Sequence, residues 1–132
     1  MILVTGATGL VGSHLLMALL ENNEKVRAIY RTAAGLEKTK SLFHSYNKTA
    51  LFDAVEWIQA DITDVPSLES VFPNVALVYH CAALISFDPN DEKILAGTRE
   101  PAQRIVKTLL DLRAENLKLT QQVSNEIEQT LK

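Results

Sequence analysis

The sequence opens with MILVTGATGLVGSHLLMALL, residues 1–20, and this stretch decides the fold class that we expect for the chain. Residues 1–4 are apolar, which favours a short strand buried on both faces. From Leu10 to Glu21 apolar residues recur at helical spacing, which predicts an amphipathic helix. Three glycines, Gly6, Gly9 and Gly12, stand three residues apart between the strand and the helix, although glycine is a poor helix former.

The three glycines give this turn the form of a phosphate-binding loop. The first turn of a helix carries unpaired backbone N–H groups and the positive end of the helix dipole, and both attract phosphate. Gly6 would allow the sharp turn, Gly9 the close approach of a pyrophosphate, and Gly12 close packing of helix on sheet. A bare turn that needs unusual φ angles is the alternative, because the spacing is G-x-x-G-x-x-G rather than G-x-G-x-x-G. We expect dinucleotide contacts from Gly6, Thr8, Gly9, Leu10, Val11 and Gly12.

The following residues alternate between strand and helix patterns. Strands are predicted at residues 25–30, 55–59 and 75–80, with helical potential over 36–46 and a short helix over 66–72 that Thr63-Asp64 can cap. Such alternation is typical of a parallel sheet with right-handed crossovers. The sequence therefore predicts an α/β fold: a Rossmann-like doubly wound parallel sheet of four strands in the order 3-2-1-4.

The chain changes character after Asp88. Pro89-Asn90-Asp91 predicts a turn with Asp91 as a helix cap, and Gly97 and Pro101 are expected to interrupt that helix. Residues 102–132 contain no glycine or proline and predict one long helix. We therefore divide the chain into a partial Rossmann domain over residues 1–95 and a C-terminal helical segment over residues 96–132.

The long helix carries apolar residues in alternating steps of four and three, and Asn116 stands in the same series: Ile105, Leu109, Leu112, Asn116, Leu119 and Val123. Such a seam is typical of a coiled coil, in which a single buried asparagine favours a parallel dimer. The seam lasts less than three heptads, so we favour an amphipathic helix that covers the open face of the sheet. A homodimer through residues 102–132 is the alternative.

Composition excludes several classes of protein. Hydrophobic residues make up 47% and charged residues 22% of the 132 residues, as in an ordinary globular domain. The net charge of −3 gives no broad basic field, so we expect no nucleic-acid partner. No apolar run reaches the roughly 18 residues of a membrane span, so we expect no membrane partner. With one cysteine, Cys81, and no metal-ligand spacing among its histidines, the chain is expected to be cytoplasmic and metal-free.

Three short motifs follow one another along the chain: TGATGLVGSHL at residues 5–15, Ala60-Asp61-Ile62, and His80-Cys81-Ala82-Ala83. As a set they resemble the extended short-chain dehydrogenase/reductases, the NAD(P)-dependent epimerase/dehydratase group, in order and spacing over about residues 1–95. The resemblance implies a nicotinamide dinucleotide cofactor, with Asp61 at the adenine amino group, Ile62 along the adenine ring, and Ala82 and Ala83 beside the cofactor. The residues alone leave a second role open for Asp61, because aspartate after a strand is also a common cap or turn residue.

The end of the second predicted strand bears on the choice between NAD and NADP. Sites that select NAD place an acidic residue there, whereas sites that select NADP place a cation there. This strand ends Ile29-Tyr30-Arg31 without an acidic residue, and the nearby cations are Arg27, Lys38 and Lys40. We expect Arg31 to contact a 2′-phosphate, with NADP favoured over NAD, although an arginine can also stack on adenine. The strand end also resembles the reductase branch of the family, which includes dihydroflavonol reductases.

The residue pair that performs the family's chemistry is not found in this sequence. The resemblance implies a catalytic tyrosine with a lysine four residues later, and such a cation lets a tyrosine exchange protons near neutral pH. The residues four positions after the tyrosines are alanines: Ala34 after Tyr30, Ala50 after Tyr46 and Ala83 after Tyr79. The sequence also leaves the family pattern near Leu95, so we expect a truncated or fused chain that binds the cofactor without turnover.

The sequence thus supports one main hypothesis and two alternatives. The main hypothesis is the NAD(P)-binding domain of an extended short-chain dehydrogenase/reductase, of the epimerase/dehydratase or carbonyl-reductase type. The second is a non-catalytic interaction or regulatory protein that dimerises through its C-terminal helix. The third is an incomplete fragment that folds poorly because its fourth strand lacks a neighbour. The sequence does not identify a substrate.

Overall fold

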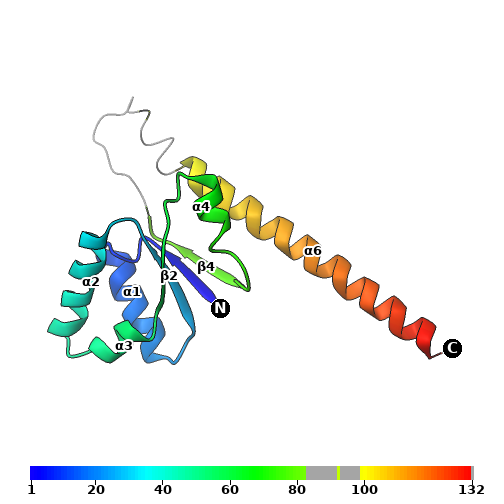
Figure 1. The fold of residues 1–132 in the computed structure, drawn as a ribbon, viewed down its shortest axis with the longest axis horizontal. Helices are drawn as coiled ribbons and strands as arrows, with labels where there is room; N and C mark the ends of the chain where they lie inside the picture. The colour runs from blue at the N-terminus through cyan, green and yellow to red at the C-terminus, as the bar shows by residue number, and fades with distance from the viewer. Residues whose placement is uncertain (83–91, 93–98, 132) are drawn as a thin grey trace.

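The computed structural model describes residues 1–82, 92 and 99–131, without the side chains of residues 116 and 117. Several sequence predictions lie outside the described residues: the role of Ala83, the helix cap at Asp91, the interruption at Gly97 and the domain boundary between residues 95 and 96. The described residues form one parallel sheet with helices packed on it (Figure 1).

Four strands form the sheet: β1 (Ile2–Thr5), β2 (Val26–Tyr30), β3 (Glu56–Gln59) and β4 (Leu77–His80). All pairings are parallel and the order is β3-β2-β1-β4, which confirms the predicted fold class and strand order. Thr5 pairs with His80 and Tyr30 with Gln59, so the carboxyl ends of the strands are aligned. The segments that follow the four strands therefore meet at one edge of the sheet.

One face of the sheet is covered by α1 (Leu10–Glu21), α2 (Ala33–Ser45) and α3 (Thr49–Asp53). α1 has the predicted bounds. α2 begins three residues earlier than predicted because Thr32 caps it: the Gly35 N–H donates to Thr32 Oγ1 at 3.1 Å. α3 is an additional helix in a segment that the sequence left as mixed structure. Its Phe52 packs edge-on against Phe43 of α2, with ring centroids 5.6 Å apart, and so closes the first core cluster.

The other face carries α4 (Val65–Glu69) and the first turns of α6 (Glu100–Thr130). Asp64 caps α4 as predicted, because its Oδ2 accepts from the Ser67 N–H at 3.1 Å. Ile105 of α6 is 3% exposed and packs with Leu3 and Leu68 in the second core cluster. Full burial of an aliphatic side chain of this size stabilises a fold by about 1.5–3 kcal/mol. The first turns of α6 therefore cover the sheet in the way that the favoured interpretation predicted.

α6 departs from the prediction in its second half. Pro101 stands in the first turn of α6, where a backbone N–H would have no helical partner, and most of the segment that it was expected to interrupt lies outside the described residues. From Arg113 to Leu131 every side chain that the structure describes is exposed, and Figure 1 shows this half of α6 running away from the sheet. Within the described residues, no helix is both long and apolar enough to cross a membrane.

Arg27 lies inside β2, as the sequence predicted, and its guanidinium binds other parts of the fold. The side chain is 8% exposed, and its Nη1 donates to the carbonyl oxygens of Val71 and Pro73, each at 2.7 Å. Its Nε lies 3.2 Å from Glu56 Oε2. Hydrogen bonds from a charged donor contribute about 1.5–3 kcal/mol each to the stability of a fold. Arg27 therefore stabilises the packing of β2 against β3 and against the turn before β4.

Candidate functional site

The turn between β1 and α1 has no room for side chains at two of its glycines. Gly6 has a φ of +66°, and a Cβ at this position would collide with the backbone of Cys81 and Ala82. A Cβ on Gly12 would overlap the carbonyl group of Gly6. Gly9 is exposed, and a Cβ there would lie 3.3 Å from the Gly6 carbonyl oxygen. Gly6 and Gly12 are therefore required by close packing, whereas Gly9 leaves the surface of the loop open.

The first turn of α1 has backbone N–H groups without a helical acceptor or a side-chain cap. Gly9 is the N-cap residue, so α1 has no side-chain cap. The first hydrogen bond of the helix runs from the Ser13 N–H to the Gly9 carbonyl at 3.0 Å, and the amides of residues 10–12 precede it. Leu10 and Val11 are 79% and 72% exposed, so the surface beside these donors is not covered. An anion placed here would find N–H donors and the positive end of the helix dipole.

Thr8 brings the glycine loop close to the start of α2. A Cβ on Gly35 would lie 3.4 Å from Thr8 Oγ1 and 3.2 Å from Thr32 Oγ1, so the first turn of α2 passes beside the loop. Arg31 precedes Thr32 directly, and its side chain is exposed. Arg31 therefore stands at the carboxyl end of β2, at the same edge of the sheet as the loop.

Asp61 follows β3 at this edge and forms a turn with Thr63. Its Oδ1 accepts hydrogen bonds from the Thr63 N–H at 2.9 Å and from the Thr63 hydroxyl at 2.7 Å. These hydrogen bonds, with a smaller contribution from the charge of Arg31, outweigh burial and lower the pKa of Asp61 below its ordinary value of 3.8. Asp61 thus has the turn role that the sequence left open. Its adenine contact stays a prediction, as does that of Ile62, which packs partly against the second core cluster.

Thr5 and His80 form a pair at the ends of β1 and β4 that the sequence analysis missed. Thr5 is fully buried, and its Oγ1 lies 2.5 Å from His80 Nδ1. Burial lowers the pKa of His80 below its ordinary value of 6.5, so the neutral form of the ring is favoured here. The only signal for this pair is the alignment of the two strand ends, which requires knowing that β1 and β4 are neighbours.

The structure brings most of the predicted site residues to one edge of the sheet. The loop residues Gly6, Thr8, Gly9, Leu10, Val11 and Gly12 follow β1, Arg31 follows β2, Asp61 and Ile62 follow β3, and Ala82 follows β4. The backbone of Ala82 packs directly against Gly6. Lys38 and Lys40 lie exposed on α2, beyond its first turn. In the described part of the chain, no group of three or more histidine, cysteine or acidic residues could hold a metal ion.

Comparison with known sequences identifies relatives that are much longer than this chain. The family model described as the NAD dependent epimerase/dehydratase family matches residues 2–127. Sterol demethylase protein B of Methylococcus capsulatus is 36% identical over 102 residues, which are 74% of this chain and 28% of that protein. The chain thus spans less than a third of the length of this curated relative.

Solved structures share the fold of the described residues. UDP-glucuronic acid 4-epimerase from Bacillus cereus, in complex with NAD, is 28% identical with a TM-score of 0.60, and the match covers 81% of this chain and 35% of that one. Yeast methylglyoxal/isovaleraldehyde reductase Gre2, complexed with NADPH, is 22% identical with a TM-score of 0.62 over 82% of this chain and 32% of that one. At 22% identity, the similarity to Gre2 shows a shared fold and nothing more. With a family model that matches nearly its whole length, the chain belongs to the NAD-dependent epimerase/dehydratase family.

Proposed function

We propose that these 132 residues bind a nicotinamide dinucleotide at the carboxyl edge of the sheet, with its pyrophosphate on the glycine loop. The observation that carries this proposal is the open first turn of α1, where Gly9 provides no cap and Leu10 and Val11 are exposed. A pyrophosphate offers the negative charge and the acceptor oxygens that such a turn lacks. Family membership supports a nicotinamide cofactor, and the two structural neighbours hold NAD and NADPH.

The edge of the sheet supplies a place for the adenosine half of the cofactor. Asp61 and Ile62 would contact the adenine, and Arg31 would bind the 2′-phosphate of NADP, which we favour over NAD. The exposure of Arg31 beside the start of α2, and the absence of an acidic residue at the end of β2, support this preference. Ala82 and Ala83 would border the cofactor because their side chains are small.

For these residues alone we propose binding without turnover. A bound nicotinamide ring donates or accepts hydride, but reduction of a carbonyl also needs a group that delivers a proton to the oxygen. Each tyrosine of the sequence has an alanine, not a lysine, four residues later. The hydroxyl of Ser13 donates to the Leu10 carbonyl at 3.1 Å, so it serves the helix and has no adjacent base.

The test is calorimetric titration of the chain and of two variants of Leu10 with NADPH. Leu10→Glu places a carboxylate in the first turn of α1, where it favours the helix by about 0.3–1 kcal/mol and repels pyrophosphate. We expect NADPH to bind at least about tenfold more weakly to this variant, a loss of roughly 1.4 kcal/mol, with no fall in the unfolding temperature. Leu10→Gln, which has the same shape without the charge, should bind as the unaltered chain does. Absence of heat at millimolar NADPH, or equal losses in both variants, would contradict the proposal.

A second candidate function, of a different class, is dimerisation through residues 102–132. Leu119 and Val123 of the seam are 59% and 53% exposed, which supports it. Ile105, Leu109 and Leu112 pack against the chain's own second core cluster, which leaves fewer seam positions for a partner. Cofactor binding therefore remains the function that we propose first.

A further inference from the structure

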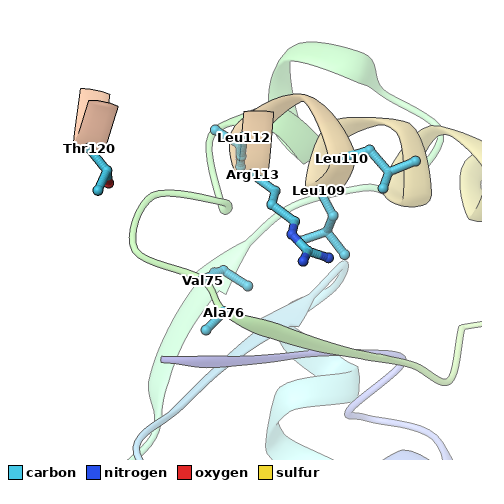
Figure 2. Close-up of a pocket in the computed structure, with 7 residues that line it drawn as sticks. All are labelled: Val75, Ala76, Leu109, Leu110, Leu112, Arg113 and Thr120. Carbon is cyan, nitrogen blue, oxygen red and sulfur yellow. The ribbon is translucent and has the colours of Figure 1, made fainter. Parts of the chain in front are cut away.

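α6 passes beside the segment that leads into β4, and a groove of about 430 Å³ lies between the two. Val75 and Ala76 line one side of the groove, and three leucines extend over it from α6 (Figure 2): Leu109, Leu110 and Leu112. Leu109 and Leu112 also pack against the second core cluster, whereas Leu110 is 60% exposed. The groove therefore presents aliphatic surface that is continuous with the core and open to solvent.

Arg113 also lines this groove, and its side chain reaches from α6 toward the Val75–Ala76 segment (Figure 2). It follows Leu109 by four residues, so the two side chains share one side of α6. Among the described residues, its guanidinium forms no ion pair and no hydrogen bond. The nearest acidic residues of the helix, Asp111 and Glu115, are two positions away and face other directions. Arg113 thus places an unpaired cation beside apolar surface.

The groove is distinct from the proposed cofactor site. Val75 and Ala76 precede β4, and the Ala76 N–H donates to the carbonyl oxygen of Met1, so this segment lies at the amino end of the sheet. The glycine loop and Arg31 follow their strands at the carboxyl edge. A ligand of the groove would therefore bind independently of the dinucleotide.

From this arrangement we infer that the groove binds a medium-chain fatty acid, with the carboxylate on Arg113 and the alkyl chain along the leucines of α6. Small-molecule sites have volumes of about 300–1,000 Å³ and combine apolar walls with a few polar groups that fix orientation, as this groove does. A guanidinium donates two parallel hydrogen bonds to a carboxylate, and an alkyl chain would remove the exposed Leu110 from water. An uncharged apolar ligand would leave Arg113 unpaired.

The experiment titrates the chain with hexanoate and octanoate, below the concentrations at which they form micelles, and follows the backbone amide signals by NMR. We expect shifts at Val75 and Ala76, and octanoate should bind at least about threefold more tightly than hexanoate, because each methylene removed from water adds affinity. Arg113→Gln should weaken octanoate binding about fivefold or more and leave the binding of octan-1-ol, which has no charge, unchanged. Lys107→Gln is the matched control, because Lys107 is an exposed cation of α6 outside the groove.

Four results would overturn the inference. The first is the absence of amide shifts with millimolar octanoate, and the second is shifts at residues 9–11 instead, which would place the carboxylate on the glycine loop. The third is an equal loss of affinity with Arg113→Gln and Lys107→Gln, which would report net charge alone. The fourth is a chain that sediments as a dimer and dissociates on Leu110→Gln, which would assign the groove to a second copy.

Thermal unfolding of each variant reports whether it is folded. Should Arg113→Gln lower the unfolding temperature, Leu110→Gln gives the same comparison, since it removes apolar surface from the groove and should also weaken octanoate binding. Val106→Gln is then the control, because Val106 and Leu110 are 57% and 60% exposed on the same helix and only Leu110 lines the groove.

Discussion

Arg31 is the residue on which the choice between the two cofactors depends. Arg31→Gln removes the guanidinium from the end of β2 without adding a charge. We expect NADPH to bind about tenfold or more weakly, because a charge-assisted hydrogen bond to phosphate contributes roughly 1.5–3 kcal/mol. NADH, which has no 2′-phosphate, should bind with unchanged affinity. Titration with both nucleotides measures the difference, and Lys38→Gln, on the exposed face of α2, is the control. Equal losses for NADPH and NADH would show that Arg31 stacks on the adenine instead.

At the residue scale, the sequence predicts contacts between residues that are close in the chain and misses contacts between residues that are far apart in it. Gly12 was found because the backbone that it packs against, at Gly6 and Ala7, is close in the sequence, whereas Gly6 was found only as a turn residue, since its close contacts with Cys81 and Ala82 are far along the chain. The hydrogen bonds of Arg27 were not predicted because its acceptors, the carbonyl groups of Val71 and Pro73, come more than 40 residues later. The pair formed by Thr5 and His80 was missed for the same reason, since it spans 75 residues.

At the element scale, the exposure of the apolar seam of α6 distinguishes packing on the sheet from dimerisation. Ile105 is buried and Leu109 and Leu112 are half-buried within the chain, so the seam positions that remain for a partner are few. We therefore expect the chain to sediment as a monomer of 14.6 kDa at tens of micromolar. Val123→Lys, in the exposed half of α6, should sediment identically. A dimer that this substitution dissociates would favour the second candidate function over our expectation.

Apolar patterning predicted α1 and the four strands well, and their predicted bounds agree with the structure to within two residues. The start of α2 was missed because Thr32 was not recognised as its cap. α3 was missed because five residues are too few to show a helical period. Pro101 was not recognised as a first-turn residue of the long helix, a position where proline is common.

At the scale of the whole molecule, stability should depend on pH through His80. Burial lowers the pKa of His80 in the folded chain, so the unfolded chain binds the proton more readily. The free energy of unfolding should therefore be unaffected by this group above the ordinary pKa of 6.5, and should fall as the pH drops from 6.5 toward the lowered value. Asp61 adds a second fall below its ordinary pKa of 3.8, because its carboxylate is stabilised only in the folded state.

Thermal unfolding of the chain between about pH 8 and pH 5 measures the contribution of His80, since Asp61 titrates below this range. We expect the unfolding temperature to fall by a few degrees toward pH 5. His80→Gln, which removes the titrating group, should remove most of this fall. His44→Gln is the control, because His44 is exposed near the end of α2. The same pH dependence in all three proteins would exclude His80 as its source.

The bare start of α1 has a consequence for the lifetime of the protein. Most helices obtain their first hydrogen-bond acceptor from a serine, threonine, aspartate or asparagine of the same chain, but Gly9 offers none. A nucleotide bound there would supply the missing acceptors for the first N–H groups of α1. At a concentration of one hundred times its dissociation constant, it would stabilise the folded chain by about 2.7 kcal/mol. Abundance in the cell would then follow nucleotide supply, with molecules that have lost their ligand degraded first.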